Sequence, residues 1–133
     1  MELPVVNHPD YVAEINDDNK FPIKKFGVLA EYLLKNRIVK KFYIPKECST
    51  ETLKTSHSLE YINHIRNKTL DIKLQKKIGF PINDSVVRRS FVATGGTVLA
   101  SKLALDTKLA CNTAGGSHHA TFYCGAVYCV FND

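Results

Sequence analysis

Residues 111–133 read CNTAGGSHHATFYCGAVYCVFND and hold the most unusual residues of this 133-residue chain. Gly115 and Gly116 allow backbone geometries closed to other residues and let the chain approach a ligand without side-chain interference. His118 and His119 follow directly. Neighbouring side chains normally point in different directions, so only a folded-back loop brings both imidazoles to one site. Since imidazole is the usual proton-transfer group near neutral pH, we interpret this loop as a candidate catalytic site.

Two other interpretations of this stretch stay open on residue types alone. Histidines often face solvent or cap an element without taking part in chemistry. Zinc binding is the other alternative, because five potential ligands lie close together: Cys111, His118, His119, Cys124 and Cys129. Their spacing matches no common zinc module, and cysteines are also ordinary core residues.

Strand-like and helix-like segments alternate upstream of the loop. Short apolar runs predict strands at 3–6, 39–44 and 109–112. Apolar side chains at helical spacing and capping residues predict helices over 22–36, from 49 or 50 to about 57, from 59 through 65, and from 83–85 to about 105. The polar segment 67–77 is expected to be an exposed loop or a helix end. This alternation predicts an α/β fold with a parallel sheet, whose ligand sites follow the carboxyl ends of the strands.

Gly95 and Gly96 lie inside the longest predicted helix. Each glycine costs about 1 kcal/mol relative to alanine in an exposed helix. The pair therefore indicates that another part of the backbone packs closely against this helix.

The composition, 44% hydrophobic and 23% charged, is that of a globular protein with one domain. No apolar run approaches the ~20 residues that cross a bilayer, and the first eight residues, MELPVVNH, lack the features of a secretory signal. We therefore expect a cytoplasmic protein without a membrane partner. The net charge of +5 is spread along the chain, which favours a solvated surface over nucleic-acid binding.

The order of residues in two segments, GGSHHA at 115–120 and YCVFND at 128–133, resembles the histone deacetylase family. That family includes the acetoin-utilisation proteins and acetylpolyamine amidohydrolases of bacteria. Further motifs extend the resemblance along the whole chain: HPDY at 8–11, FPIKK at 21–25, the Leu53, His57, Tyr61 spacing, GFP at 79–81 and TGGT at 94–97. The resemblance implies a three-layer arginase/deacetylase-type fold around a parallel sheet.

The same resemblance implies a zinc-dependent hydrolase that removes acyl groups from lysine or polyamine amines. On the family pattern His119 is the general base and His118 is its electrostatic partner. Gly116 lines the base of the site, and Tyr128 forms one wall of the channel that takes the acylated substrate.

Two departures from the family pattern change these expectations. Val127 stands where the family usually has glycine, beside the channel aromatic. The family's zinc ligands, an Asp-x-His pair and a further Asp, lie beyond residue 133, and no Asp-x-His triplet occurs in this sequence.

We therefore expect residues 1–133 to be the N-terminal part of one deacetylase-like domain, truncated on its C-terminal side just after the double-histidine loop. Asn132 and Asp133 fit this expectation, because they form a helix N-cap signal with no helix after it. The chain alone is expected to bind no metal and to be inactive. The alternative is a noncatalytic subunit that pairs with a chain supplying the rest of the fold.

Overall fold

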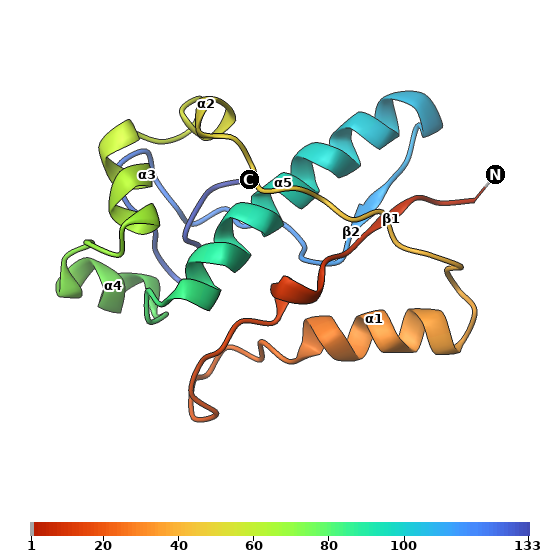
Figure 1. Cartoon of the computed structure of the whole chain (residues 1–133), viewed down its shortest axis with the longest axis horizontal. Coiled ribbons are helices and arrows are strands. Elements are labelled where there is room, and N and C mark those ends of the chain that lie inside the picture. The colour runs from red at the N-terminus through yellow and green to blue at the C-terminus, as the bar shows by residue number, and fades with distance from the viewer. Residues whose placement is uncertain (1) are drawn as a thin grey trace.

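A long helix, α5, organises the computed structural model, which describes residues 2–133. The elements in chain order are β1 (Val5–Val6), the 3-10 helix η1 (Pro9–Tyr11), α1 (Lys25–Lys35), α2 (Thr50–Leu53), α3 (Leu59–Arg66), α4 (Ile72–Ile78), α5 (Asp84–Thr107) and β2 (Cys111–Asn112). The first half of α5 is buried beside α3, α4 and the C-terminal segment, and its second half runs along the sheet (Figure 1).

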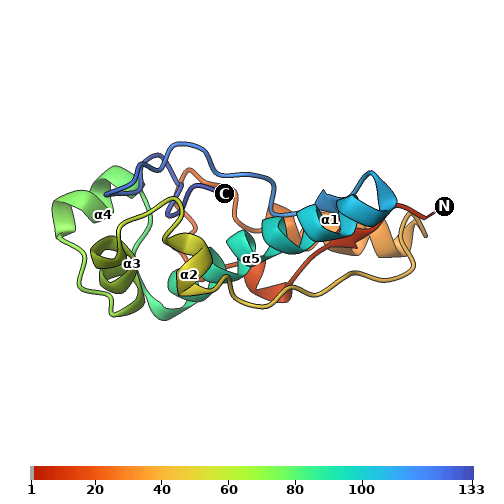
Figure 2. The same ribbon diagram turned by 90° about the horizontal axis from the view of Figure 1, so that it is seen from above.

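The sheet is parallel, as the sequence predicts. Val5 pairs with Cys111 and Val6 with Asn112, and Tyr43 forms a single parallel bridge to Val6. Helix α5 packs against both strands, and α1 lies on the opposite side of the sheet (Figures 1 and 2). This helix–sheet–helix layering confirms the predicted α/β class and places the loop after β2 at the carboxyl end of the strands.

Short polar side chains begin the helices where the sequence indicates. Ser49 Oγ accepts a hydrogen bond from the Thr52 amide at 3.1 Å, which caps α2. Asn83 Oδ1 accepts from the Val86 amide at 2.9 Å, which caps α5. Each side-chain oxygen satisfies one of the free N–H groups of a first helical turn. Local capping chemistry therefore fixes these helix starts.

Two predicted segments differ from the structure. The predicted strand at 39–44 is irregular, and within it Tyr43 alone pairs with β1. The segment expected as a loop or helix end at 67–77 contains α4, which Asp71 caps by accepting from the Lys73 amide at 2.8 Å. Its lysines face solvent while Ile78 is fully buried, so tertiary packing stabilises a helix that a polar composition obscures.

The predicted close approach of another backbone is confirmed at Gly95, whereas Gly96 faces side chains. A Cβ on Gly95 would lie 1.9 Å from the Lys46 carbonyl oxygen, and one on Gly96 would lie 2.1 Å from the Tyr11 hydroxyl. The Cys48 amide also donates to the carbonyl of Phe91, one turn earlier on α5, at 2.9 Å. Glycine is therefore required for the segment around residue 46 and for η1 to reach the helix.

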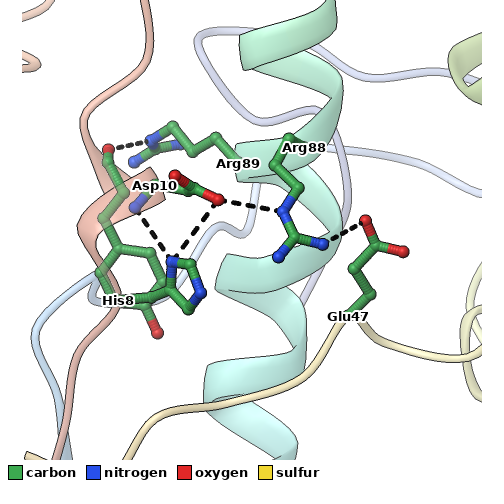
Figure 3. A network of polar contacts seen from close by, with 6 residues as sticks. His8, Asp10, Glu47, Arg88 and Arg89 are labelled. Carbon is green, nitrogen blue, oxygen red and sulfur yellow. Dashed lines mark hydrogen bonds and ion pairs between the residues drawn. The ribbon is translucent and has the colours of Figure 1, made fainter.

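Two consecutive arginines join η1 to α5 (Figure 3). Arg88 Nε donates to Asp10 Oδ2 at 2.9 Å and its Nη1 to Glu47 Oε1 at 2.7 Å, and these bonds raise the pKa of Arg88. The buried Arg89 donates from Nε to the Tyr11 carbonyl at 2.8 Å. Burial lowers the pKa of Arg89 to about 10, against the opposing field of Asp133. The pair holds the N-terminal segment on the helix that supports the double-histidine loop.

Among the described residues, no helix is both long and apolar enough to cross a membrane.

Candidate functional site

Asn112, the last residue of β2, fixes the start of the double-histidine loop with four side-chain hydrogen bonds. Its Oδ1 accepts from the Tyr11 hydroxyl at 2.8 Å and from the Ala114 amide at 3.3 Å. Its Nδ2 donates to the Ala93 carbonyl and to Thr97 Oγ1, both at 3.3 Å. The loop therefore leaves the sheet from a point anchored to both η1 and α5.

The chain turns directly after Asn112. The Gly115 amide donates to the Asn112 carbonyl at 3.0 Å, and Gly115 has φ +70°, in the left-handed region that favours glycine. An added Cβ on Gly115 or Gly116 would meet nothing within 4 Å. Gly115 is therefore required for its backbone conformation, whereas Gly116 leaves open space beside the loop.

His118 and His119 lie side by side at the surface. Their ring centroids are 4.1 Å apart with an angle of 38° between the ring planes. Both side chains are exposed, and neither imidazole has a hydrogen-bond partner among residues 2–133. The folded-back loop inferred from the sequence is confirmed, and both rings are free to meet a ligand.

The C-terminal residues hold this loop from the other side. Asn132 Nδ2 donates to the carbonyls of His118, at 3.3 Å, and Ala120, at 2.9 Å. The carboxylate of Asp133 accepts from the Ser117 amide and, at 2.7 Å, from Thr97 Oγ1. Burial raises the pKa of the Asp133 carboxyl, and these two hydrogen bonds oppose the rise. The backbone on both sides of the histidine pair is therefore fixed by side chains 12–16 residues later in the chain.

Two residues around the start of α3 anchor the C-terminal segment in turn. The Asn132 amide donates to His57 Nε2 at 2.9 Å, and the Tyr61 hydroxyl donates to the Val130 carbonyl at 2.6 Å. His57 is 1% exposed, and its Nδ1 has no partner among the described residues. Burial lowers the pKa of His57, although the nearby carbonyls of Thr121 and Phe122 oppose that shift.

The other two predicted site residues have different neighbours. Gly116 is exposed and borders a shallow hollow beside Thr97, Ala100, Ser101 and Ala104 of α5. Tyr128 packs on Phe21 and Phe80, with ring centroids 5.2 and 5.3 Å away. No contact described within residues 2–133 joins Tyr128 to either histidine. The structure thus unites the histidines with the loop glycines but not with Tyr128.

A sequence profile of the histone deacetylase domain matches residues 20–133. The chain belongs to the histone deacetylase domain family. An uncharacterized protein of Picosynechococcus sp. is 41% identical over 135 residues, covering all of this chain and 45% of that protein. Histone deacetylase 2 of Arabidopsis thaliana is 28% identical over 129 residues, covering 85% of this chain and 31% of that protein.

Solved structures show that the fold is shared with this family. An HDAC homolog complexed with SAHA matches 99% of this chain and 39% of its own at a TM-score of 0.77 and 20% identity. The HD domain of HDA15 matches 99% of this chain and 40% of its own at a TM-score of 0.73 and 13% identity. The chain thus spans less than half the length of each of these relatives.

The donor set of residues 2–133 does not fit zinc. Among residues 2–133, no group of three or more His, Cys, Asp or Glu side chains is placed to hold a metal ion. The two exposed imidazoles supply at most two donors on one loop, and structural or catalytic zinc takes three or four protein ligands.

Sequence analysis missed the residues that position the loop. Asn132 and Asp133 carry a helix N-cap signal, yet in the structure they hold the histidine loop. His57 stands in a motif of the family resemblance without an assigned role. The sequence does carry a signal for the role of Asn132 and Asp133: this polar pair directly follows the apolar run 127–131. Polar side chains next to a buried segment need hydrogen-bond partners.

Proposed function

We propose that this chain supplies the double-histidine half of a deacetylase site that hydrolyses acyl-lysine or acyl-amine amides. His119 acts as the general base that accepts a proton from the attacking water, and His118 acts as its electrostatic partner. The observation that carries the proposal is the exposed pair of rings 4.1 Å apart on a loop fixed at Asn112, Ser117 and Ala120. A general base needs a free imidazole, and the exposed rings on a hydrogen-bonded loop backbone support this assignment.

The substrate contacts in this proposal are the open space at Gly116 and the ring of Tyr128. Gly116 leaves the backbone beside the histidines accessible to a small acyl group. Tyr128 presents a partly buried aromatic ring that suits the apolar stem of an acylated lysine or polyamine. Uniting Tyr128 with the histidines requires further polypeptide or a rearrangement of the segment 127–129.

Zinc, in this proposal, is bound by ligands outside these 133 residues, since the donors present do not form a site. The chain alone is therefore inactive. A complementing chain that carries the rest of the domain restores the site, and β2 offers an edge for it, because β2 pairs only with β1 within residues 2–133.

The experiment combines the purified chain with the part of the Picosynechococcus protein that lies outside the region matched by this chain, produced as a separate polypeptide. Release of acetate from an acetyl-lysine peptide and from an acetylpolyamine is measured with added zinc. We expect no turnover from the chain alone and chelator-sensitive turnover from the pair. His119→Ala is expected to lower the rate of the pair by about 100-fold or more, the usual contribution of a general base.

His64→Ala is the matched control, because His64 is an exposed histidine on α3 outside the double-histidine loop. Chelator-sensitive turnover from the chain alone would contradict the proposed inactivity. An unchanged rate with His119→Ala would contradict the role of His119. A stable pair without turnover would favour the noncatalytic complementing subunit instead.

A further inference from the structure

We propose that His57 is a positioning residue of the double-histidine loop, which it holds through Asn132. This inference rests on the proposed function for its catalytic meaning, because it assigns a residue that keeps the two site histidines in place. His57 lies just before α3, 61 and 62 positions before the two histidines in the sequence.

The hydrogen bond that the His57 side chain accepts connects it to the loop through Asn132. The backbone amide of Asn132 donates to His57 Nε2 at 2.9 Å. The side-chain amide of the same residue donates to the carbonyls on either side of His119: His118 at 3.3 Å and Ala120 at 2.9 Å. A displacement of the Asn132 backbone therefore moves the side chain that fixes the histidine pair.

The surroundings of His57 indicate that a histidine is needed here because its Nε2 accepts the hydrogen bond from Asn132. The ring is 1% exposed and lies beside Tyr61 and Phe131, with ring centroids 5.6 and 5.3 Å away. Since Nε2 accepts a hydrogen bond, the neutral ring carries its proton on Nδ1, which is buried without a partner among residues 2–133. The carbonyls of Thr121 and Phe122 lie near the ring, but the one hydrogen bond that it makes among the described residues is the one accepted from Asn132, and a phenylalanine could not accept it.

Tyr61 provides a matched comparison on the same segment. Its hydroxyl donates to the Val130 carbonyl at 2.6 Å, two residues before Asn132. Tyr61 therefore anchors the C-terminal segment, but it makes no bond to the residue that reaches the histidine loop. If His57 only stabilises the C-terminal segment, removing the His57 or the Tyr61 hydrogen bond should affect the two loop histidines equally. If His57 positions the loop, removing its bond alone should affect them.

The test compares His57→Phe, His57→Gln and Tyr61→Phe in the 133-residue chain by NMR. The ring-proton chemical shifts of His118 and His119 report the loop, because each ring senses its neighbour. Hydrogen exchange of the Asn132 amide reports the anchor. We expect His57→Phe to change both ring signals and to speed exchange of the Asn132 amide roughly tenfold, as the loss of one hydrogen bond does.

His57→Gln is expected to give the wild-type ring signals, since its side-chain oxygen can take the place of Nε2 and accept the hydrogen bond from the Asn132 amide. Tyr61→Phe is expected to leave the ring signals unchanged. Asn132→Ala keeps the backbone bond to His57 and is expected to shift the ring signals as His57→Phe does. The double variant, His57→Phe with Asn132→Ala, is expected to shift them no further.

Unchanged ring signals in His57→Phe, or equal shifts in Tyr61→Phe, would overturn the proposal. If His57→Phe does not fold, wild-type signals in Asn132→Ala or altered signals in His57→Gln would overturn it. None of these measurements uses turnover. Failure of the complementation experiment would therefore overturn the deacetylase proposal and leave this result standing, and the reverse also holds.

Discussion

Val127 and Tyr128 are consecutive non-glycine residues with left-handed backbone conformations, φ 49° and 62°. Their amides donate to the carbonyls of Lys77, at 3.1 Å, and Ile78, at 2.6 Å, so pairing with the end of α4 imposes this geometry. A β-branched residue is strongly disfavoured there, at a cost of order 1–3 kcal/mol. The family resemblance led us to expect glycine at this position, and the backbone of Val127 adopts a conformation that glycine favours.

Val127→Gly is therefore expected to stabilise the chain by about 1 kcal/mol, because relief of strain exceeds the added entropy of the unfolded chain. The measurement is the free energy of unfolding in urea, with Val127→Ala expected between the two. Val28→Gly is the control, since Val28 is similarly exposed but lies in α1, where glycine lowers stability. Equal losses from both glycine substitutions would show that Val127 is unstrained.

His57 gives the chain a pH dependence with a defined sign. Burial lowers the pKa of His57 below its ordinary value of 6.5. Below pH 6.5 the unfolded chain takes up a proton that the folded chain does not, so this contribution to stability is full above pH 6.5 and is lost as the pH falls toward the folded pKa. One group contributes a slope of at most about 1.4 kcal/mol per pH unit.

We expect the free energy of unfolding to fall between pH 7 and pH 5 more steeply in the wild type than in His57→Gln. Urea titrations at several pH values measure this difference. His64→Gln, which replaces a partly exposed histidine on α3, is the control variant. Parallel pH profiles for wild type and His57→Gln would show that His57 is not neutral and buried.

At the scale of elements, the contact between α5 and the segment before α2 depends on Gly95. Gly95→Ala is expected to destabilise the chain by about 2 kcal/mol or more, although alanine favours a helix by about 1 kcal/mol. The added methyl group would overlap the Lys46 carbonyl, which is backbone and cannot move aside cheaply. Unfolding in urea measures the loss.

Gly27→Ala is the matched control within α1, because its Cβ would only touch a side-chain methyl of Val12 at 3.3 Å. We expect this variant to be neutral or more stable than the wild type. A Gly95→Ala variant as stable as Gly27→Ala would show that the segment around residue 46 does not pack on α5 as described.

The same elements show what the sequence can predict. Helix starts at Ser49 and Asn83 follow from local hydrogen bonds between neighbouring residues, so they are readable from the sequence. The close approach at Gly95 was predictable because glycine has a known cost in a helix. The prediction for the segment that forms α4 was wrong, and the predicted strand at 39–44 was incomplete. Whether these segments are helical or extended depends on partners far away in the chain.

The site divides in the same way. The pairing of His118 with His119 is local, and the two glycines before it indicate it in the sequence. The tethers from Asn132 and Asp133, and the anchor at His57, join positions from 12 to 75 residues apart, which no local pattern encodes. The position of Tyr128 is set by Phe21 and Phe80, again across the chain.

At the scale of the whole molecule, α1 is attached by few buried side chains. Phe26 is its one buried residue, whereas Val28, Leu29 and Tyr32 are 65%, 42% and 58% exposed. An isolated helix of 11 residues is marginal in water, so most of the stability of α1 has to come from packing. By contrast, residues 89–92 of α5 are buried in the core.

We therefore expect native-state hydrogen exchange to separate these two helices. Amides in the second half of α1 exchange through local opening, with a low free energy that hardly depends on urea. Amides at residues 91–94 of α5 exchange only on global unfolding and follow its urea dependence. Because Gly95→Ala weakens the global transition, it lowers protection in α5 and leaves α1 unchanged. If α1 instead lost protection together with α5, the chain would open as a single cooperative unit, and α1 would be held by contacts stronger than its exposed apolar side chains indicate.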